Sequence, residues 1–264
     1  MSDLNRNYAS PFGRVAGRAD AAAVDAGLRA YMLRIYNYMS IGLAITGLAA
    51  LGVYMAAVTG DPSAAVAKFG NNVYLTQFGY AMFVSPLKWL FILAPLIMVF
   101  AISAGINRLA PSTAQMLFWV FSALMGVSLS SIFLVYTHTS IVRVFFITAA
   151  TFGALSLYGY TTKRDMTGFG SFLFMGLIGI VIASFVNLFI GSSMLQFAVS
   201  VIGVFVFAGL TAWDTQRLKS EYIYGYASAG GDVAERAAIT GALSLYLNFI
   251  NLFTLLLQLL GQRD

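Results

Sequence analysis

The last long apolar segment of the chain, AAITGALSLYLNFINLFTLLLQLLG, carries a row of polar side chains. Their spacings of four, three and seven residues place them on one stripe of a helix: Ser244, Asn248, Asn251 and Gln258. Each amide has donors and an acceptor that lipid cannot satisfy. The stripe is therefore expected to face other helices or to line a water-filled path, and the spacing leaves both roles open.

An acidic side chain stands beside another apolar segment. Of the ten Asp and Glu residues, only Asp214, in FAGLTAWDTQRLK, abuts a candidate membrane span. An ionisable group in that position is a candidate for function, because it can hold a cation or a proton. The alternative is a local role, in which Asp214 pairs with Arg217 three residues further on or caps the following turn.

Two other side chains could take part in chemistry. Arg108, in AGINRLAPS, could be a partner of the acid across the bundle, or could serve only to orient the protein in its membrane. His138, in VYTHTS, has no acidic or cysteine companion at the spacing of metal ligands. We therefore expect no metal site and no bound cofactor.

The composition decides which elements must position these residues. The chain has 264 residues, of which 59% are hydrophobic and 9% charged, and it contains no cysteine. Its mean hydropathy is +0.82. Only helices or closed barrels satisfy their backbone groups in lipid, and the apolar runs are about 20 residues long, which is the length of a spanning helix. The sequence predicts an all-α integral membrane protein.

Seven transmembrane helices are expected, at residues 35–58, 87–106, 114–136, 141–161, 170–190, 194–213 and 238–260. Residues 1–30 are polar to neutral and are expected to form a flexible N-terminal cytoplasmic arm, leading into a short interfacial helix near LRAYMLRIYNYM. Residues 31–264 would form the membrane domain. The longest external connection, Thr59–Pro86, is expected to lie at the outer surface or to re-enter it.

The distribution of basic residues predicts the orientation. The N-terminal arm and the even-numbered connections hold eleven Lys and Arg residues, and the opposite side holds four. The positive-inside rule then places the N-terminus in the cytoplasm and the C-terminus outside. The net charge of +5 is explained in the same way, so we expect the lipid bilayer as partner and no nucleic acid. Short connections suit a bacterial inner (cell) membrane.

The segment FAGLTAWDTQRLK, followed about thirty residues later by GALSLYLNFINLFTLLLQLLG, closely resembles the Bax inhibitor-1 family, also called the transmembrane Bax inhibitor motif family. LRAYMLRIYNYMSIGLAITGL is similar to the start of its bacterial members. The resemblance covers about Leu28 to Gly261. It implies six helices around a central C-terminal helix, a pH-sensitive calcium leak and, in eukaryotes, suppression of cell death.

In this family a pair of aspartates, one ending span six and one within span seven, shares a proton and works as a pH-responsive latch, and a basic residue near the end of span two is implicated in the same gate. Asp214 matches the first aspartate and Arg108 is a match for the basic residue. Where similar members read LYLDFINLF, this chain reads LYLNFINLF, so Asn248 stands in the acidic position, whereas Asn251 fits the family pattern. An aspartate beside an asparagine cannot share a proton, but the amide can donate to the ionised carboxylate.

Two functions follow as hypotheses. The first is a calcium leak channel of this family, with a cation path along the last span and Asp214 as the acid at its inner mouth. The second is a non-conducting regulator that acts through membrane protein partners, with Asp214 and Asn248 as a static latch. An enzyme is not expected, because the last span has no lysine for a Schiff base and the one histidine lies in an outer loop.

Overall fold

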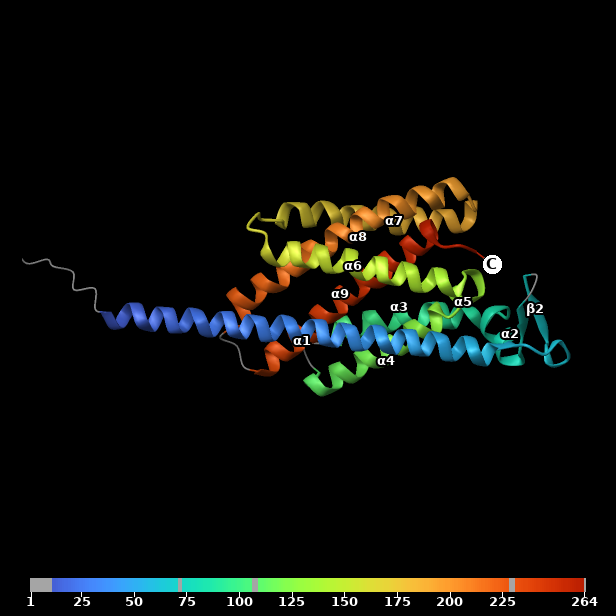
Figure 1. Cartoon of the computed structure of the whole chain (residues 1–264), viewed down its shortest axis with the longest axis horizontal. Helices are drawn as coiled ribbons and strands as arrows, with labels where there is room; N and C mark the ends of the chain where they lie inside the picture. Colours follow the sequence, from blue (N-terminus) through green and yellow to red (C-terminus); the bar gives the residue numbers. More distant parts are fainter. Residues whose placement is uncertain (1–10, 71–72, 106–108, 228–230, 264) are drawn as a thin grey trace, which may run out of the picture.

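The computed structural model describes residues 11–70, 73–105, 109–227 and 231–263, with side chains from Ala23 onward. Seven helices in this part of the chain are long and apolar enough to cross a membrane. They run side by side along the long axis of the molecule (Figure 1). The predicted class, an all-α membrane protein with seven transmembrane helices, is confirmed.

The long helices are α1 (Pro11–Ala57), α3 (Lys88–Gly105), α4 (Pro111–Leu129), α6 (His138–Thr161), α7 (Thr167–Ile190), α8 (Ser193–Glu221) and α9 (Gly231–Leu260). Short elements connect them: β1 (Val58–Thr59), η1 (Pro62–Ala64), β2 (Ala67–Phe69), β3 (Val73–Leu75), α2 (Gln77–Phe83), α5 (Ile132–Val135) and the π-helical turn η3 (Tyr222–Tyr226).

Local sequence signals explain several helix ends. Pro111 is the first residue of α4, a position where its missing N–H costs nothing. The side chains of Thr137 and Ser192 cap the first turns of α6 and α8. Gly191 ends α7 in the left-handed conformation that glycine adopts without strain, with φ of 66°. The connection between α7 and α8 is therefore tight.

The first span differs from its prediction. One continuous helix, α1, replaces the interfacial helix and the span starting at residue 35, so no break in the backbone marks the division at residue 30. Leu28, Tyr31 and Ile35 are buried, and Tyr31 stacks on Tyr222 with ring centroids 5.0 Å apart. Packing against η3 thus supports the helical conformation of α1 around Tyr31.

The sixth span also continues further than expected. The structure extends α8 from the predicted end at residue 213 to Glu221, a further two turns. The polar sequence after Trp213 ends the apolar run, but nothing in it breaks a helix. Asp214 therefore lies within a helix and does not cap the following turn, and that part of the local alternative was wrong.

The long connection after α1 is folded. Strands β1, β3 and β2 form a small antiparallel sheet in that order, with Val58 opposite Leu75 and Lys68 opposite Tyr74. Thr76 caps α2 and also donates from Oγ1 to the carbonyl oxygen of Ala56. These bonds hold the connection against the end of α1 (Figure 1).

Close helix contacts depend on two glycines. A Cβ placed on Gly126 would collide with the backbone of Thr46, and one placed on Gly159 would collide with the backbone of Ala212. These glycines let α4 approach α1 and let α6 approach α8, as small residues do between helices in lipid. The four helices that they bring together are those against which α9 packs.

Helix α9 has the most buried apolar window of the seven spans, at 56%. It packs against α1, α4, α6 and α8, whereas α3 packs on α4 and α7 packs on α8. Tyr246 of α9 is fully buried, where its hydroxyl lies 2.6 Å from Thr46 Oγ1. The arrangement of all six other helices around α9 remains a prediction.

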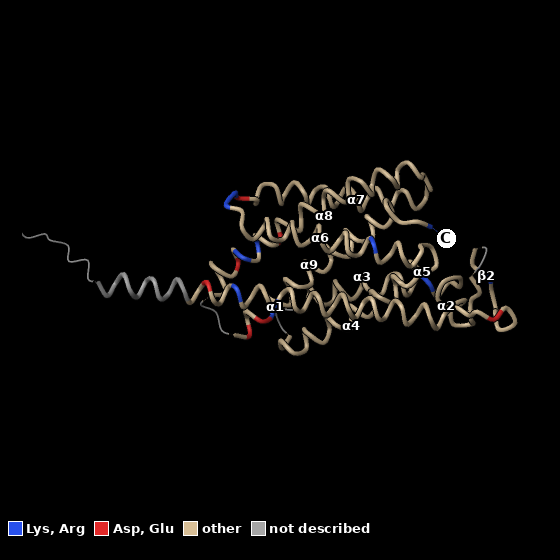
Figure 2. The backbone as a smooth tube through the Cα atoms, in the orientation of Figure 1, with Lys and Arg blue, Asp and Glu red and all other residues tan. Residues whose placement is uncertain are grey.

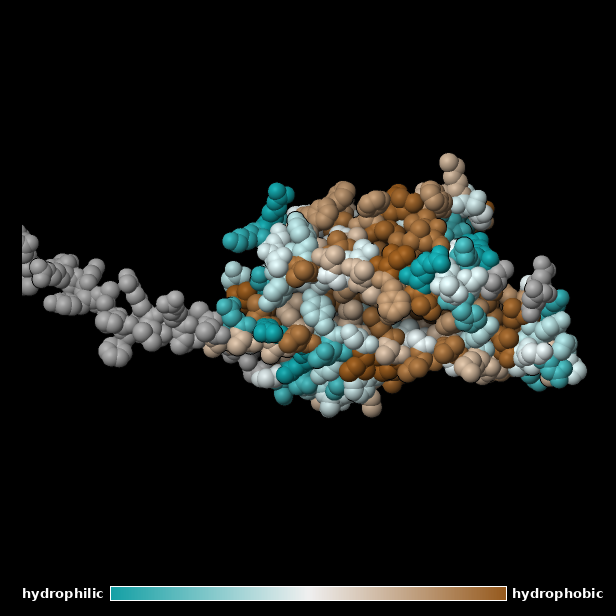
Figure 3. Space-filling model, in the orientation of Figure 1, coloured by the Kyte–Doolittle hydropathy of each residue, from teal (hydrophilic) through white to brown (hydrophobic). Residues whose placement is uncertain are grey.

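Charged and hydrophobic residues occupy different parts of the molecular surface, as expected for a membrane protein. Lys and Arg gather at the end of the bundle that holds the α6–α7 connection and the end of α8 (Figure 2). The face seen in Figure 3 is mainly hydrophobic along the middle of the bundle and more hydrophilic toward its two ends. This pattern fits helices that expose apolar side chains to lipid.

Candidate functional site

The structure brings Asp214 of α8 against Asn248 of α9. Both side chains are buried, each residue retaining 6% of its exposure. Asn248 Nδ2 donates to Asp214 Oδ2 at 2.7 Å. The two residues are thus paired by a direct hydrogen bond between the helices, with an amide donor at the position where the resemblance implies a second acid.

Arg217 holds the other oxygen of the same carboxylate. Its Nη2 atom lies 2.5 Å from Asp214 Oδ1. The predicted local pair therefore exists, but it exists together with the Asn248 bond and does not replace it. Each oxygen of Asp214 therefore accepts one hydrogen bond, and both bonds, one of them from a guanidinium, favour the ionised carboxylate.

Further contacts fix the guanidinium of Arg217. It lies over the Trp213 ring at 4.9 Å from the centroid, and Nη2 also lies 3.4 Å from Ser244 Oγ. Its Nε atom is 3.9 Å from Glu221 Oε1, too far for a hydrogen bond, and has no hydrogen-bond partner in the described structure. Arg217 thus belongs to the site, whereas the sequence indicated it only as a neighbour three residues away.

The polar stripe of α9 faces a cavity of about 700 Å³ between α7, α8 and α9, which we call the stripe cavity. All four stripe residues line it, together with Asp214 and Arg217. The opposite wall is formed by apolar side chains of α7, among them Phe174 and Val181. The volume has room for more than ten waters, since each takes roughly 30 Å³ in the liquid.

A second cavity of about 420 Å³ lies at the end of α8 and the beginning of α9, and we call it the end cavity. Its charged lining residues are Arg217, Glu221 and Arg236. Arg217 and Ser244 line both cavities. The pair of Arg217 and Asp214 therefore stands where the two cavities meet.

The remaining stripe residues differ in their contacts. Asn251 Nδ2 donates to the carbonyl oxygen of Leu247 within α9, at 2.8 Å. Gln258 accepts a hydrogen bond from Ser200 Oγ of α8, at 2.8 Å. The stripe thus combines contacts between helices with a cavity wall, whereas a water-filled path along it stays a prediction.

Two further candidates came from the sequence. Arg108 lies outside the described residues, so its predicted part in the gate stays a prediction. His138 is the first residue of α6 and packs near the rings of Tyr54 and Phe133. Among the described residues, no group of three or more His, Cys, Asp or Glu side chains is placed to hold a metal ion.

Sequence comparison adds an independent observation to this geometry. The sequence model of the family described as "Inhibitor of apoptosis-promoting Bax1" matches residues 28–264. The chain belongs to the Bax inhibitor-1 family. The match includes α8 and α9 with the whole Asp214 site, and it begins at Leu28, inside the buried part of α1.

Relatives extend along nearly the whole chain. The chain is 47% identical to the inner membrane protein YbhL of Escherichia coli, over 90% of this chain and 94% of that protein. It is 44% identical to a protein of Caulobacter vibrioides, over 99% and 98% of the two chains. A Rickettsia prowazekii protein is 46% identical, over 90% of this chain and 92% of its own length. This multi-pass membrane protein therefore has bacterial family relatives of its own length.

Proposed function

We propose that the protein is a cation leak channel of the Bax inhibitor-1 family whose path follows the polar stripe of α9. The observation that supports this most strongly is a buried carboxylate, Asp214, at the junction of two cavities, held there by Asn248 and Arg217. Ionisable groups inside a membrane bundle are expensive and commonly mark ion pathways.

The charges along the proposed path set its expected behaviour. Asp214 is the only carboxylate among the described residues that line the stripe cavity, and Arg217 compensates it. A compensated carboxylate attracts a divalent cation weakly. In the resting arrangement the ion pair of Arg217 with Asp214 therefore closes the path, and we call Arg217 its lock. Conduction requires the guanidinium to move away from Asp214.

Calcium is the cation that the family resemblance implies, and the pH response should be weaker than in members with two aspartates. Two adjacent carboxylates share a proton because their charges repel, and the proton relieves that repulsion. An amide at position 248 gains nothing from a proton within the usual pH range. The latch of this chain is accordingly a fixed hydrogen bond between helices.

The proposal includes a place and an orientation. The chain would lie in a bacterial inner membrane, in keeping with the printed name of its E. coli relative. The basic end of the bundle would face the cytoplasm by the positive-inside rule. The N-terminus would then be cytoplasmic and the C-terminus external, and the end cavity would open toward the cytoplasm.

A second candidate is a regulator that passes no ions and acts through membrane protein partners. The hydrogen bonds that Arg217 and Asn248 donate to the two Asp214 oxygens favour it, because a static latch needs no other ligand. On this view the cavities are structural, and the Asp214 site only ties α8 to α9.

Calcium flux into vesicles that contain the purified protein separates the two candidates. The channel proposal expects measurable flux with the wild type and lower flux with Asp214→Asn, because that variant leaves Arg217 as an uncompensated positive charge in the path. Asp165→Asn, which removes the same charge from the α6–α7 connection and lines neither cavity, is the charge control. Absence of flux from the wild type and from Asn248→Asp alike would support the regulator instead.

A further inference from the structure

Helices α1 and α6 leave a groove between them. They pack mainly against α4, α8 and α9 and make few contacts with each other. Among the described residues, one side-chain hydrogen bond joins the two helices, between Tyr36 Oη and Ser156 Oγ. Two cavities lie along this seam, of about 570 Å³ and about 310 Å³. We call the whole seam the α1–α6 groove.

The groove is as long as the apolar part of a bilayer. Its lining on α1 runs from Arg29 to Ala50 at helical spacing: Arg29, Met32, Leu33, Tyr36, Met39, Leu43, Thr46, Gly47 and Ala50. Those 21 steps span about 31 Å at 1.5 Å per residue. The hydrocarbon core of a bilayer is about 30 Å thick. The two cavities together therefore extend over a length comparable with the thickness of the hydrocarbon core.

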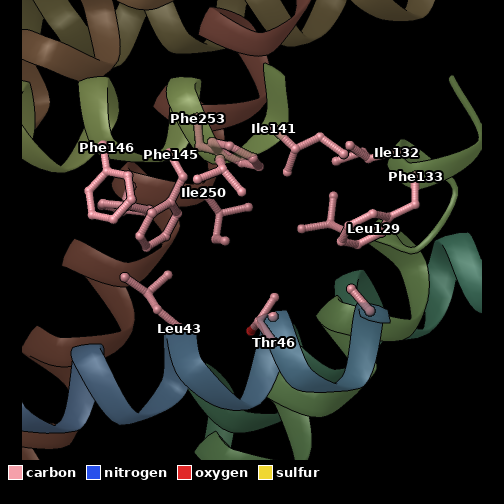
Figure 4. Close-up of a pocket in the computed structure, with 14 residues that line it drawn as sticks. Leu43, Thr46, Leu129, Ile132, Phe133, Ile141, Phe145, Phe146, Ile250 and Phe253 are labelled. Carbon is pink, nitrogen blue, oxygen red and sulfur yellow. The ribbon is translucent and has the colours of Figure 1, made fainter. Parts of the chain in front are cut away.

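The cavity farther from Arg29 is lined almost entirely by apolar atoms. Figure 4 shows Leu43 and Thr46 of α1 facing Phe145 and Phe146 of α6 across the open space, with Ile250 of α9 behind them. Thr46 uses its hydroxyl in bonds within the protein, including the one to Tyr246. An occupant of this part would meet hydrocarbon and aromatic rings, with no free polar partner.

The cross-section of the smaller cavity suits a hydrocarbon chain and is too small to enclose a helix. The smaller cavity follows α1 from Leu43 to Ala50, a rise of about 10 Å, so its 310 Å³ correspond to a cross-section of about 30 Å². A helix with side chains is about 10–12 Å in diameter, which is a cross-section of roughly 80–110 Å². An extended acyl chain is much narrower than that.

Positive charge lies at one end of the groove. Arg29 and Tyr160 line the larger cavity there. Lys219 Nζ donates to the carbonyl oxygen of Tyr160 at 2.9 Å and lies 5.1 Å from the centroid of its ring. In the part of the chain that the structure describes, neither Arg29 nor Lys219 forms an ion pair, although Asp25 lies one turn before Arg29 on α1. Two cations thus flank the end of an apolar groove.

We propose that the α1–α6 groove binds an anionic phospholipid. Its phosphate lies between Arg29 and Lys219, and one acyl chain lies along the groove toward Ile250. The charged end matches the headgroup and the apolar lining matches the chain. A single phospholipid lies in one leaflet, so its chain would fill the half of the groove nearest Arg29. This site is separate from the proposed cation path, which lies on the opposite side of α9.

Glycines that line the groove allow a direct test. A Cβ added at Gly47 or Gly153 would meet no atom within 4 Å, so a larger side chain would fill the groove without disturbing the packing. Gly52, on the same helix as Gly47, is equally open but lines no described cavity, and it is the matched control. The full-length protein is incorporated into vesicles of phosphatidylglycerol and phosphatidylethanolamine, released in mild detergent, and its bound lipid measured by native mass spectrometry.

We expect the wild type and Gly52→Leu to retain phosphatidylglycerol and Gly153→Leu, in the cavity that Arg29 lines, to lose it. Gly47→Leu fills the far cavity, about 27 Å from Arg29 along α1, and should reduce retention less. Arg29→Gln with Lys219→Gln should keep bound lipid but lower the preference for phosphatidylglycerol by about fivefold for each charge removed. Equal retention by all glycine variants would overturn the proposal, and so would an unchanged headgroup preference in the charge variant. A lipid-free wild type that dimerises through this seam would show a helix as occupant and would also overturn it.

Discussion

Replacing Arg217 by glutamine removes the guanidinium that holds Asp214 at the junction of the two cavities. The lost contact is a hydrogen bond between charged groups, 2.5 Å long, to a carboxylate whose side chain is 9% exposed. Hydrogen bonds of this kind contribute about 1.5–3 kcal/mol. The guanidinium itself is 36% exposed, so solvent weakens the pair and the lower value applies.

A change of about 1.5 kcal/mol corresponds to about tenfold in an equilibrium. If Arg217 is the lock of the path, the open population and the calcium flux into vesicles should therefore rise about tenfold in Arg217→Gln. The variant also leaves Asp214 as an uncompensated negative charge, which attracts divalent cations and acts in the same direction.

Arg236→Gln is the matched control, because it removes the same charge from the end cavity, where no bond to Asp214 is described. It should change the flux much less than Arg217→Gln does. If the two variants raise the flux equally, the flux depends only on the net charge of the end cavity. The proposal that the bond of Arg217 to Asp214 closes the path would then be refuted. If Arg217→Gln leaves the flux unchanged, or lowers it in folded protein, the reasoning about Asp214 is wrong.

Three further predictions follow from the same geometry. Asn248→Asp places a second carboxylate beside Asp214, so calcium flux measured across a pH series should become strongly pH-dependent. The flux should be high where both acids are ionised and should fall as the pair takes up a proton. A pH profile parallel to that of the wild type would contradict this. Gly159→Val should lower the free energy of unfolding by about 1–3 kcal/mol, because the new side chain meets the backbone of Ala212. The effect is measured as a lower midpoint in thermal unfolding. Gly153→Val on the same helix should change the free energy of unfolding little. Reporter tags should place the N-terminus in the cytoplasm and the C-terminus outside, and a cytoplasmic C-terminus would refute the orientation.

The sequence predicted the fold where one physical requirement dominates. Apolar runs of about 20 residues have few alternatives to a spanning helix, so the seven spans were found and most ends agree within a few residues. The stripe of α9 was also predictable, because helical periodicity decides which side chains share a face. Its contact with a cavity, however, depends on where α7 lies.

The sequence did not predict features that depend on distant contacts. Strands β1, β2 and β3 have two or three residues each, too few for an alternating pattern, and are defined by pairing with one another. Tyr31 and Ile35 of α1 are buried only because η3 and α9 pack over them. Arg217 appeared to be a surface partner, since its contacts with Trp213 and Ser244 require α8 to continue beyond its apolar run and to meet α9.

The central claim is that the polar stripe of α9 lines a water-filled cation path. The chain contains no cysteine, so a single Asn251→Cys variant offers one thiol, and Phe205→Cys on the exposed face of α8 serves as its control. The decisive measurement is calcium flux before and after treatment with a positively charged, water-soluble thiol reagent. The reagent should modify Asn251→Cys and block its flux while leaving flux through Phe205→Cys unchanged. Modification of Asn251→Cys without any change in flux, or an unreactive thiol in a conducting protein, would contradict it.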